Sequence, residues 1–159
     1  MITEPAFADR NLQELVGKWV GTGRITTDPD TQTKRSRCHV VVQSEIVENS
    51  VLLDGRCSVA EGVGRIRARL VDDGGGNVRA GFTSSISPEA TQLRGVIEVD
   101  GINLASQNGF SWDGAIYSVR VRIEFQDDDN FEIKEWNALE GTVDWKLVTD
   151  LQFTKSGED

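Results

Sequence analysis

The chain has 159 residues, a formal charge of −9 and an isoelectric point near 4.6. This length predicts a single domain over residues 1–159, with a hydrophobic core that needs no metal or disulfide to hold it together. The negative charge disfavours nucleic acid and anionic lipid surfaces, because both are bound through basic patches. The sequence shows neither a membrane-spanning apolar run nor a signal-peptide pattern. We therefore expect a cytoplasmic protein whose residues 1–7 are flexible.

The first predicted element is a short amphipathic helix over residues 8–16. Its apolar residues recur at helical spacing, and Asp9 is placed to cap the first turn. Gly17 follows the last periodic residue, where glycine commonly ends a helix.

From Trp19 onward the apolar residues recur at every second position, which is the period of a β-strand. Turn residues separate the segments, as in Asp113-Gly114. The predicted strands are 18–26, 34–47, 51–60, 64–72, 77–84, 91–99, 102–110, 115–126, 131–139 and 142–154.

These strands have no long helices between them, so they cannot form a parallel sheet, whose crossovers need a dozen residues or more. The connections are mostly of hairpin length, and almost every strand has one apolar and one polar face. In strand 115–126, for example, Val119 and Val121 alternate with Arg120 and Arg122. This pattern favours a closed barrel over a sandwich. The predicted fold is all-β: an antiparallel up-and-down β-barrel of about ten strands with a short N-terminal helix.

The two ends of the chain resemble the calycin superfamily of lipocalin-like barrels. Gly17-Lys18-Trp19 matches the lipocalin Gly-x-Trp at the start of the first strand. The stretch LVGKWVGTG is similar to the opening of small bacterial lipocalin-like families and of nitrobindin-like haem barrels. Phe153-Thr154-Lys155 resembles the aromatic-x-basic pattern whose cation packs over the first-strand tryptophan in lipocalins. The resemblance implies a barrel with a small-molecule site. It also implies a late haem-ligating histidine in the nitrobindin-like case, and this C-terminal region has none.

We interpret Trp19 as a structural plug at the closed end of the barrel, stacked by Lys155. Gly21 and Gly23 share the face of Trp19. They either leave interior space for a ligand or let the strand bend and approach its neighbour. Candidate ligand-contacting positions are the inward-facing residues Gly21, Gly23, Ile25, Val40, Val42, Phe82, Leu93, Tyr117, Val119, Val121, Glu135 and Trp145.

Few residues carry recognisable chemistry. Cys38 and Cys57 are predicted to be cross-strand neighbours on the inner face and, in the cytoplasm, reduced thiols. His39, the single histidine, faces outward, so we expect no haem, no metal site and no other cofactor. Glu135 is the one acid that strand parity places inward, which makes it a candidate acid or base. A bulge in its strand, or a place at the barrel mouth, would remove that role.

The sequence favours a lipocalin-like protein that binds a small, mostly apolar ligand inside the barrel. The arginines of strand 64–72 face outward, so the interior offers no clear partner for a carboxylate ligand. Whether the protein is an enzyme is left undecided, with a binding role preferred. One alternative is a barrel enzyme of the isomerase or cyclase type that uses a single buried acid. The other is an oligomerising interaction protein, such as a homodimer, without a ligand.

Overall fold

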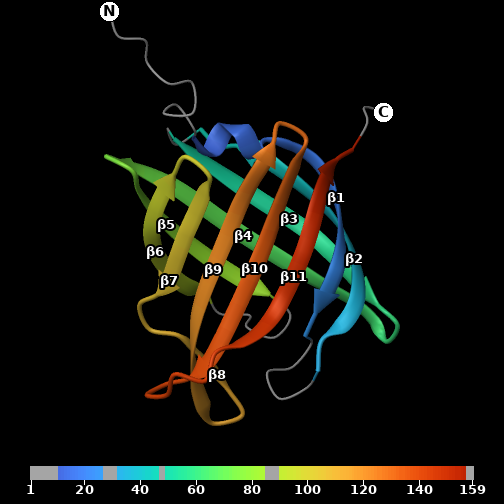
Figure 1. Ribbon diagram of the computed structural model, residues 1–159, viewed down its shortest axis with the longest axis vertical. Coiled ribbons are helices and arrows are strands. Elements are labelled where there is room, and N and C mark those ends of the chain that lie inside the picture. The colour runs from blue at the N-terminus through green and yellow to red at the C-terminus, as the bar shows by residue number, and fades with distance from the viewer. Residues whose placement is uncertain (1–10, 27–31, 47–48, 85–89, 157–159) are drawn as a thin grey trace, which may run out of the picture.

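The computed structural model describes residues 11–26, 32–46, 49–84 and 90–156, which form a β-barrel (Figure 1). The strands are β1 (Gly17–Ile25), β2 (Lys34–Ser44), β3 (Ser50–Val59), β4 (Gly62–Gly74), β5 (Asn77–Ser84), β6 (Thr91–Glu98), β7 (Gly101–Ser106), β8 (Phe110–Trp112), β9 (Ala115–Asp127), β10 (Asn130–Leu139) and β11 (Lys146–Lys155).

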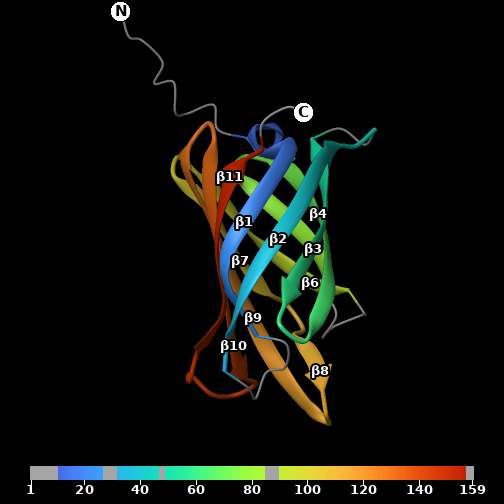
Figure 2. The ribbon, with the colours of Figure 1, turned by 90° about the vertical axis from the view of Figure 1, so that its right-hand side faces the viewer.

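Ten antiparallel strands close the barrel in the order β10-β11-β1-β2-β3-β4-β5-β6-β7-β9, and β9 pairs back onto β10. Figure 2 shows β1 lying between β11 and β2, where the two ends of the chain meet. The predicted all-β, up-and-down barrel is therefore confirmed. The predicted strand 102–110 is divided into β7 and β8, because Gly109 turns the chain at a φ of +63°. The short β8 pairs with the start of β9, outside the closed ring.

Alternation along the strands builds the core, as the sequence predicts. In β9, Val119 and Ile123 are buried while Arg120 between them is exposed. The turn into β9 uses Asp113 and Gly114, both with positive φ, which suits the twist of a two-residue hairpin turn.

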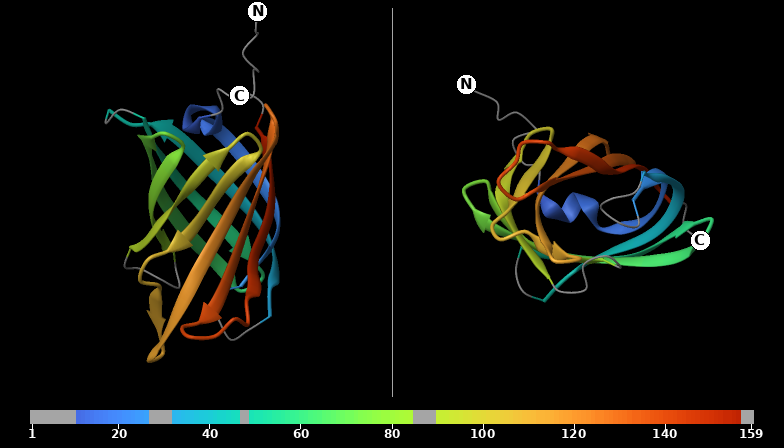
Figure 3. Two further views of the ribbon diagram at one scale, coloured as in Figure 1. Left: turned by 60° about the vertical axis from the view of Figure 1, so that its left-hand side comes forward. Right: turned by 90° about the horizontal axis from the view of Figure 1, so that it is seen from below.

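The N-terminal element is a single 3₁₀ turn, η2 (Leu12–Leu15), which is shorter than the predicted helix over 8–16. Asn11 caps the turn in a capping box with Glu14, and Asp9 lies outside the described residues. The backbone is already extended at Val16, so the chain passes directly into β1. Figure 3 shows η2 lying across one end of the barrel. Leu12 and Leu15 are buried there and cover the core.

A β-bulge corrects the prediction for the last strand. β11 begins at Lys146 rather than at residue 142, and Val148 is skipped in the pairing between β10 and β11. An extra residue reverses the faces of everything before it, so Val148 is buried and Leu147 is exposed. Because β11 begins at Lys146, Trp145 lies before the strand, with the Arg120 guanidinium 4.2 Å from its ring centroid.

The two cysteines are the second correction. They are directly opposite each other in the register of β2 and β3, on the inner face as predicted. They form a disulfide instead of remaining free thiols. The expectation of reduced cysteines rested on the predicted compartment, whereas the register brings their Cα atoms to within 4.0 Å. The bond ties two neighbouring strands together through the interior of the barrel.

Candidate functional site

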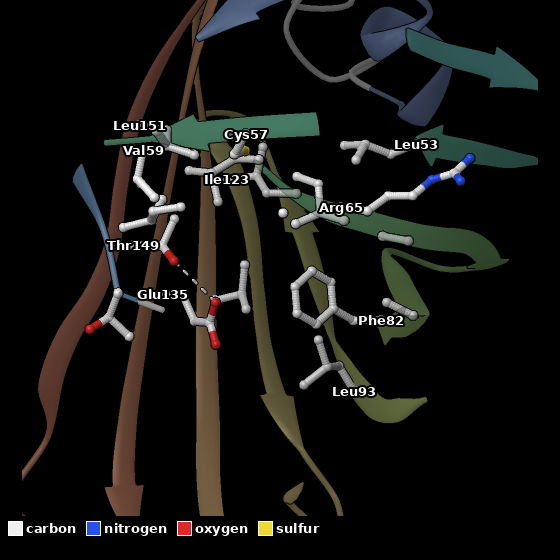
Figure 4. A pocket seen from close by; sticks show the side chains of 18 of the residues that line it. Leu53, Cys57, Val59, Arg65, Phe82, Leu93, Ile123, Glu135, Thr149 and Leu151 are labelled. Atoms are coloured by element: carbon white, nitrogen blue, oxygen red, sulfur yellow. Dashed lines mark hydrogen bonds between the residues drawn. The ribbon is translucent and has the colours of Figure 1, made fainter. Parts of the chain in front are cut away.

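The barrel encloses a cavity of about 330 Å³ below the plugged end. Nine of the eleven strands contribute to its wall, so the closed sheet rather than any single loop defines its shape. Most of the wall is apolar, and its residues include Ile66, Ala68, Phe82, Leu93, Val121 and Ile133. Figure 4 shows Phe82 and Leu93 on one side of this space and Glu135 on the other. Ligand pockets commonly measure about 300–1,000 Å³, so this cavity suits a compact molecule.

Trp19 and its neighbours close one end of the barrel. The Trp19 side chain is buried, and its Nε1 donates a hydrogen bond of 2.8 Å to the Leu15 carbonyl oxygen. Its ring meets Phe131 edge to face at 4.5 Å between centroids. Lys155 is paired with Trp19 in the β1–β11 register, and its Nζ lies 5.2 Å from the Trp19 ring centroid. These contacts are those of a structural plug stacked by a cation.

The cavity opens at the other end, beside the hairpin between β3 and β4. Its wall includes Glu61 and Val63, which are exposed to solvent. Lys34 forms a 3.1 Å salt bridge with Glu61 at this mouth. Arg65 also borders the cavity, but its guanidinium donates two hydrogen bonds to the Asp54 carboxylate, at 3.3 and 3.2 Å, on the outer face. The Arg65 guanidinium is therefore directed away from the interior.

Glu135 is the acidic residue within the apolar part of the wall. It lies in β10 opposite Val121 of β9 and Thr149 of β11. Thr149 Oγ1 donates a 3.3 Å hydrogen bond to Glu135 Oε1. In the amide orientation that its neighbours require, the Asn137 nitrogen donates to Glu135 Oε2 at 3.1 Å. The bulge is in β11 rather than in β10, so Glu135 keeps its inward direction.

The environment of Glu135 changes its acidity. Protein atoms surround the carboxyl, and the side chain is half-buried where it borders the cavity. Burial raises the pKa of Glu135 from its ordinary value of 4.5 to about 7, and the hydrogen bond from Thr149 opposes this rise. A carboxyl that changes charge near neutral pH can accept, donate or hold a proton at the cavity wall.

The structure brings together some of the predicted interior positions and separates others. Ile25, Phe82, Leu93, Val121 and Glu135 line the cavity. The remaining positions lie elsewhere. Val40, Val42 and Val119 are in the packed core, Tyr117 stacks on Phe110 at 5.5 Å, and Trp145 is outside the barrel wall.

Gly21 and Gly23 serve close packing rather than leaving space. A Cβ on Gly21 would lie 2.5 Å from the Phe153 ring, which fills the volume next to it. A Cβ on Gly23 would lie 2.0 Å from the Asp150 carbonyl oxygen of β11, and its φ is +153°. The sequence allowed either space for a ligand or a close approach between strands, and the geometry matches the close approach.

Several wall residues were not singled out from the sequence. Ala68 and Ala80 keep the middle of the cavity open because their side chains are small, and small inward residues on neighbouring strands were the available signal. Thr149 faces the cavity by the same alternation that buries Leu151 and Phe153, so strand parity was the available signal for it. The mouth is formed by a hairpin, and no periodic pattern marks it.

The described residues offer little for a metal. No group of three or more His, Cys, Asp or Glu side chains is placed to hold an ion within this part of the chain. His39 is exposed on the outer face of β2, opposite Arg56. No helix among the described ranges is both long and apolar enough to cross a membrane.

Comparison with known proteins supports the fold. No protein-family model and no curated protein matches the sequence. Among solved structures, the chain is similar to the S-type phycobiliprotein lyase CPES from Guillardia theta, with a TM-score of 0.61 over 96% of this chain and 97% of that one. The two sequences are 12% identical, so the likeness shows a shared barrel fold alone.

Proposed function

We propose that this protein is a lipocalin-like binding protein that holds a small, mostly apolar molecule inside its barrel. The single observation that carries this proposal is the cavity of about 330 Å³, apolar over most of its wall and open at one end. Small-molecule sites combine an apolar wall with a few polar groups that orient the ligand. Here Glu135 and Thr149 supply such groups.

The similarity to the phycobiliprotein lyase supports the proposal at the level of architecture, because that protein is built on a comparable barrel over nearly its whole length. Membership of the calycin superfamily is part of the proposal. It rests on Gly17-Lys18-Trp19 and on the contact between Lys155 and Trp19.

A second candidate function is a barrel enzyme that uses Glu135 as a single acid or base. The raised pKa of Glu135 favours it, because proton transfer is most effective when the group titrates near the working pH. Within the part of the chain that the structure describes, the cavity wall does not supply the second reactive group that most acid–base chemistry needs. Its other ionisable residues are Glu61, paired with Lys34, and Arg65, paired with Asp54. Binding therefore remains the preferred function.

The test is occupation of the cavity. Native mass spectrometry of freshly purified protein is expected to show a bound small molecule, and the emptied protein is expected to bind 1-octanol in titration calorimetry. Ala68→Phe places a large ring in the cavity and should abolish this binding. Ala105→Phe makes the same change on the outer face of β7 and should leave it unchanged. No co-purified molecule together with no 1-octanol binding would refute the proposal.

A further inference from the structure

We propose that the cavity selects an apolar molecule bearing a primary or secondary amine, bound with its nitrogen at the Glu135 carboxylate. This inference rests on the proposed binding function and names the class of ligand. It adds a single cationic group to the small, mostly apolar ligand expected from the sequence.

Glu135 lies where it can meet the polar end of a bound molecule. Its carboxyl lies on the wall of β10, between the side chains of its cross-strand partners Val121 and Thr149. Phe82 and Leu93 face it across the cavity (Figure 4). An apolar skeleton held against these side chains would present its polar end to Glu135.

The hydrogen bonds that Glu135 already accepts leave room for a further donor. An ionised carboxylate has about four acceptor positions on its two oxygens. Thr149 occupies one on Oε1 and Asn137 occupies one on Oε2. These two donors fix the orientation of the group and leave acceptor positions for a ligand. An ammonium group offers donors and no acceptor, which matches what the carboxylate still lacks.

The charged side chains of the cavity wall favour a cationic ligand over an anionic one. Among the described residues, the ionisable side chains of its wall are Glu135, Glu61 and Arg65, and the Arg65 guanidinium is bound to Asp54 on the outer face. The wall therefore carries negative rather than positive charge toward a ligand. An anionic ligand would lose its hydration without gaining a partner, whereas a cation would gain one already in place.

Binding of an amine should depend on pH through Glu135. The groups packed around it are Val121 from β9, Thr149 from β11 and Asn137 from its own strand, and none of them titrates in the working range. Ile25 of β1 and the aromatic Phe82 of β5 are apolar parts of the same wall, and Glu61 and Arg65 are its other charged members. Amine affinity should rise as the pH increases from 5 to 8, because Glu135 becomes ionised.

The experiment compares three ligands of equal length on the full chain: octylamine, 1-octanol and octanoate, measured by titration calorimetry at pH 8. At this pH the amine is protonated and the acid is ionised. A charge-assisted hydrogen bond contributes about 1.5–3 kcal/mol, which is about 10- to 100-fold in affinity. We expect octylamine to bind at least about 10-fold more tightly than 1-octanol, and octanoate to bind most weakly.

The matched variants are Glu135→Gln and Glu45→Gln. Glu135→Gln keeps the shape of the side chain and removes its charge, so octylamine affinity should fall about 10- to 100-fold while 1-octanol binding changes little. Glu45 lies outside the cavity wall and is paired with Arg69, so Glu45→Gln should preserve the preference for the amine.

The outcomes separate the two proposals. If 1-octanol binds the native protein as tightly as octylamine, the amine inference is wrong and the binding function stands. If octanoate binds most tightly, the charge argument is wrong. If none of the three binds, the proposed function itself fails. The comparison on the native chain decides these points even if Glu135→Gln does not fold.

Discussion

Replacing Glu135 with glutamine should alter how the stability of the protein depends on pH. In the unfolded chain the carboxyl titrates near 4.5, whereas burial raises its pKa in the folded protein to about 7. Between these values the folded state keeps a proton that the unfolded state loses. The stability of the native protein should therefore fall as the pH rises through this window and level off above about 7.

The magnitude follows from the two pKa values. At about 1.4 kcal/mol for each tenfold change in proton affinity, a pKa rise from 4.5 to about 7 corresponds to about 3 kcal/mol of lost stability. Roughly 2 to 3 kcal/mol of this falls between pH 5 and pH 8. Glutamine has no charge to bury, so the Glu135→Gln variant should gain this amount relative to the native protein over the same interval.

The assay is urea unfolding at pH 5 and pH 8 for the native chain, Glu135→Gln and Glu45→Gln. Arg69 lowers the pKa of Glu45 through a hydrogen bond and its charge, so Glu45 is largely ionised in both states across this interval. The Glu45→Gln difference should thus be nearly constant. If the free-energy difference between the native chain and Glu135→Gln is also the same at both pH values, Glu135 is solvated in the folded protein, and the reasoning about its burial is refuted.

Three further predictions concern the framework of the barrel. Alkylation in denaturant without reductant should leave Cys38 and Cys57 unmodified, and reduction should cost about 3 kcal/mol, given the 19-residue separation of the two half-cystines; labelling of both thiols would contradict the disulfide. Gly95→Ala should destabilise the protein by at least about 2 kcal/mol in urea unfolding, because its Cβ would lie 1.6 Å from a backbone carbonyl oxygen. Gly81→Ala, which meets nothing closer than 3.7 Å, should stay within about 0.5 kcal/mol; equal effects would contradict the packing argument. Trp19→Phe removes the donor that satisfies a buried carbonyl and should cost about 1–3 kcal/mol by thermal and urea unfolding, whereas an unchanged midpoint would show that this hydrogen bond contributes nothing.

Strand parity predicted most of the fold, because each strand of a closed barrel has one face toward the core and one toward solvent. The inward residues of β4 and β9 follow directly from alternation, as does the outward direction of the arginines on these strands. The same rule placed Glu135 on the inner face. It carries no information on depth, so the raised pKa of that carboxyl depends on neighbours that only the register identifies.

The wrong predictions have separate origins, and alternation along a strand records none of them. The skipped residue at Val148 turned Leu147 outward, and β11 begins only at Lys146, so Trp145 lies outside the wall. The opposition of Cys38 and Cys57 was predicted correctly, and only the assumed compartment led to the prediction of free thiols. The inward space next to Gly21 is filled by the ring of Phe153. Periodicity therefore predicts which face a residue occupies better than what it touches there.

The pairing of β1 with β11 has a consequence for how the chain folds. Most neighbouring strands are joined by short hairpins and can associate as soon as both have been synthesised. The contact of Trp19 with Lys155 spans nearly the whole chain, so the ring can close only after the last strand has left the ribosome. Until then β1 and β10 are open edges that can pair with other chains. Loss of β11 through truncation should therefore cause aggregation rather than leave a smaller barrel.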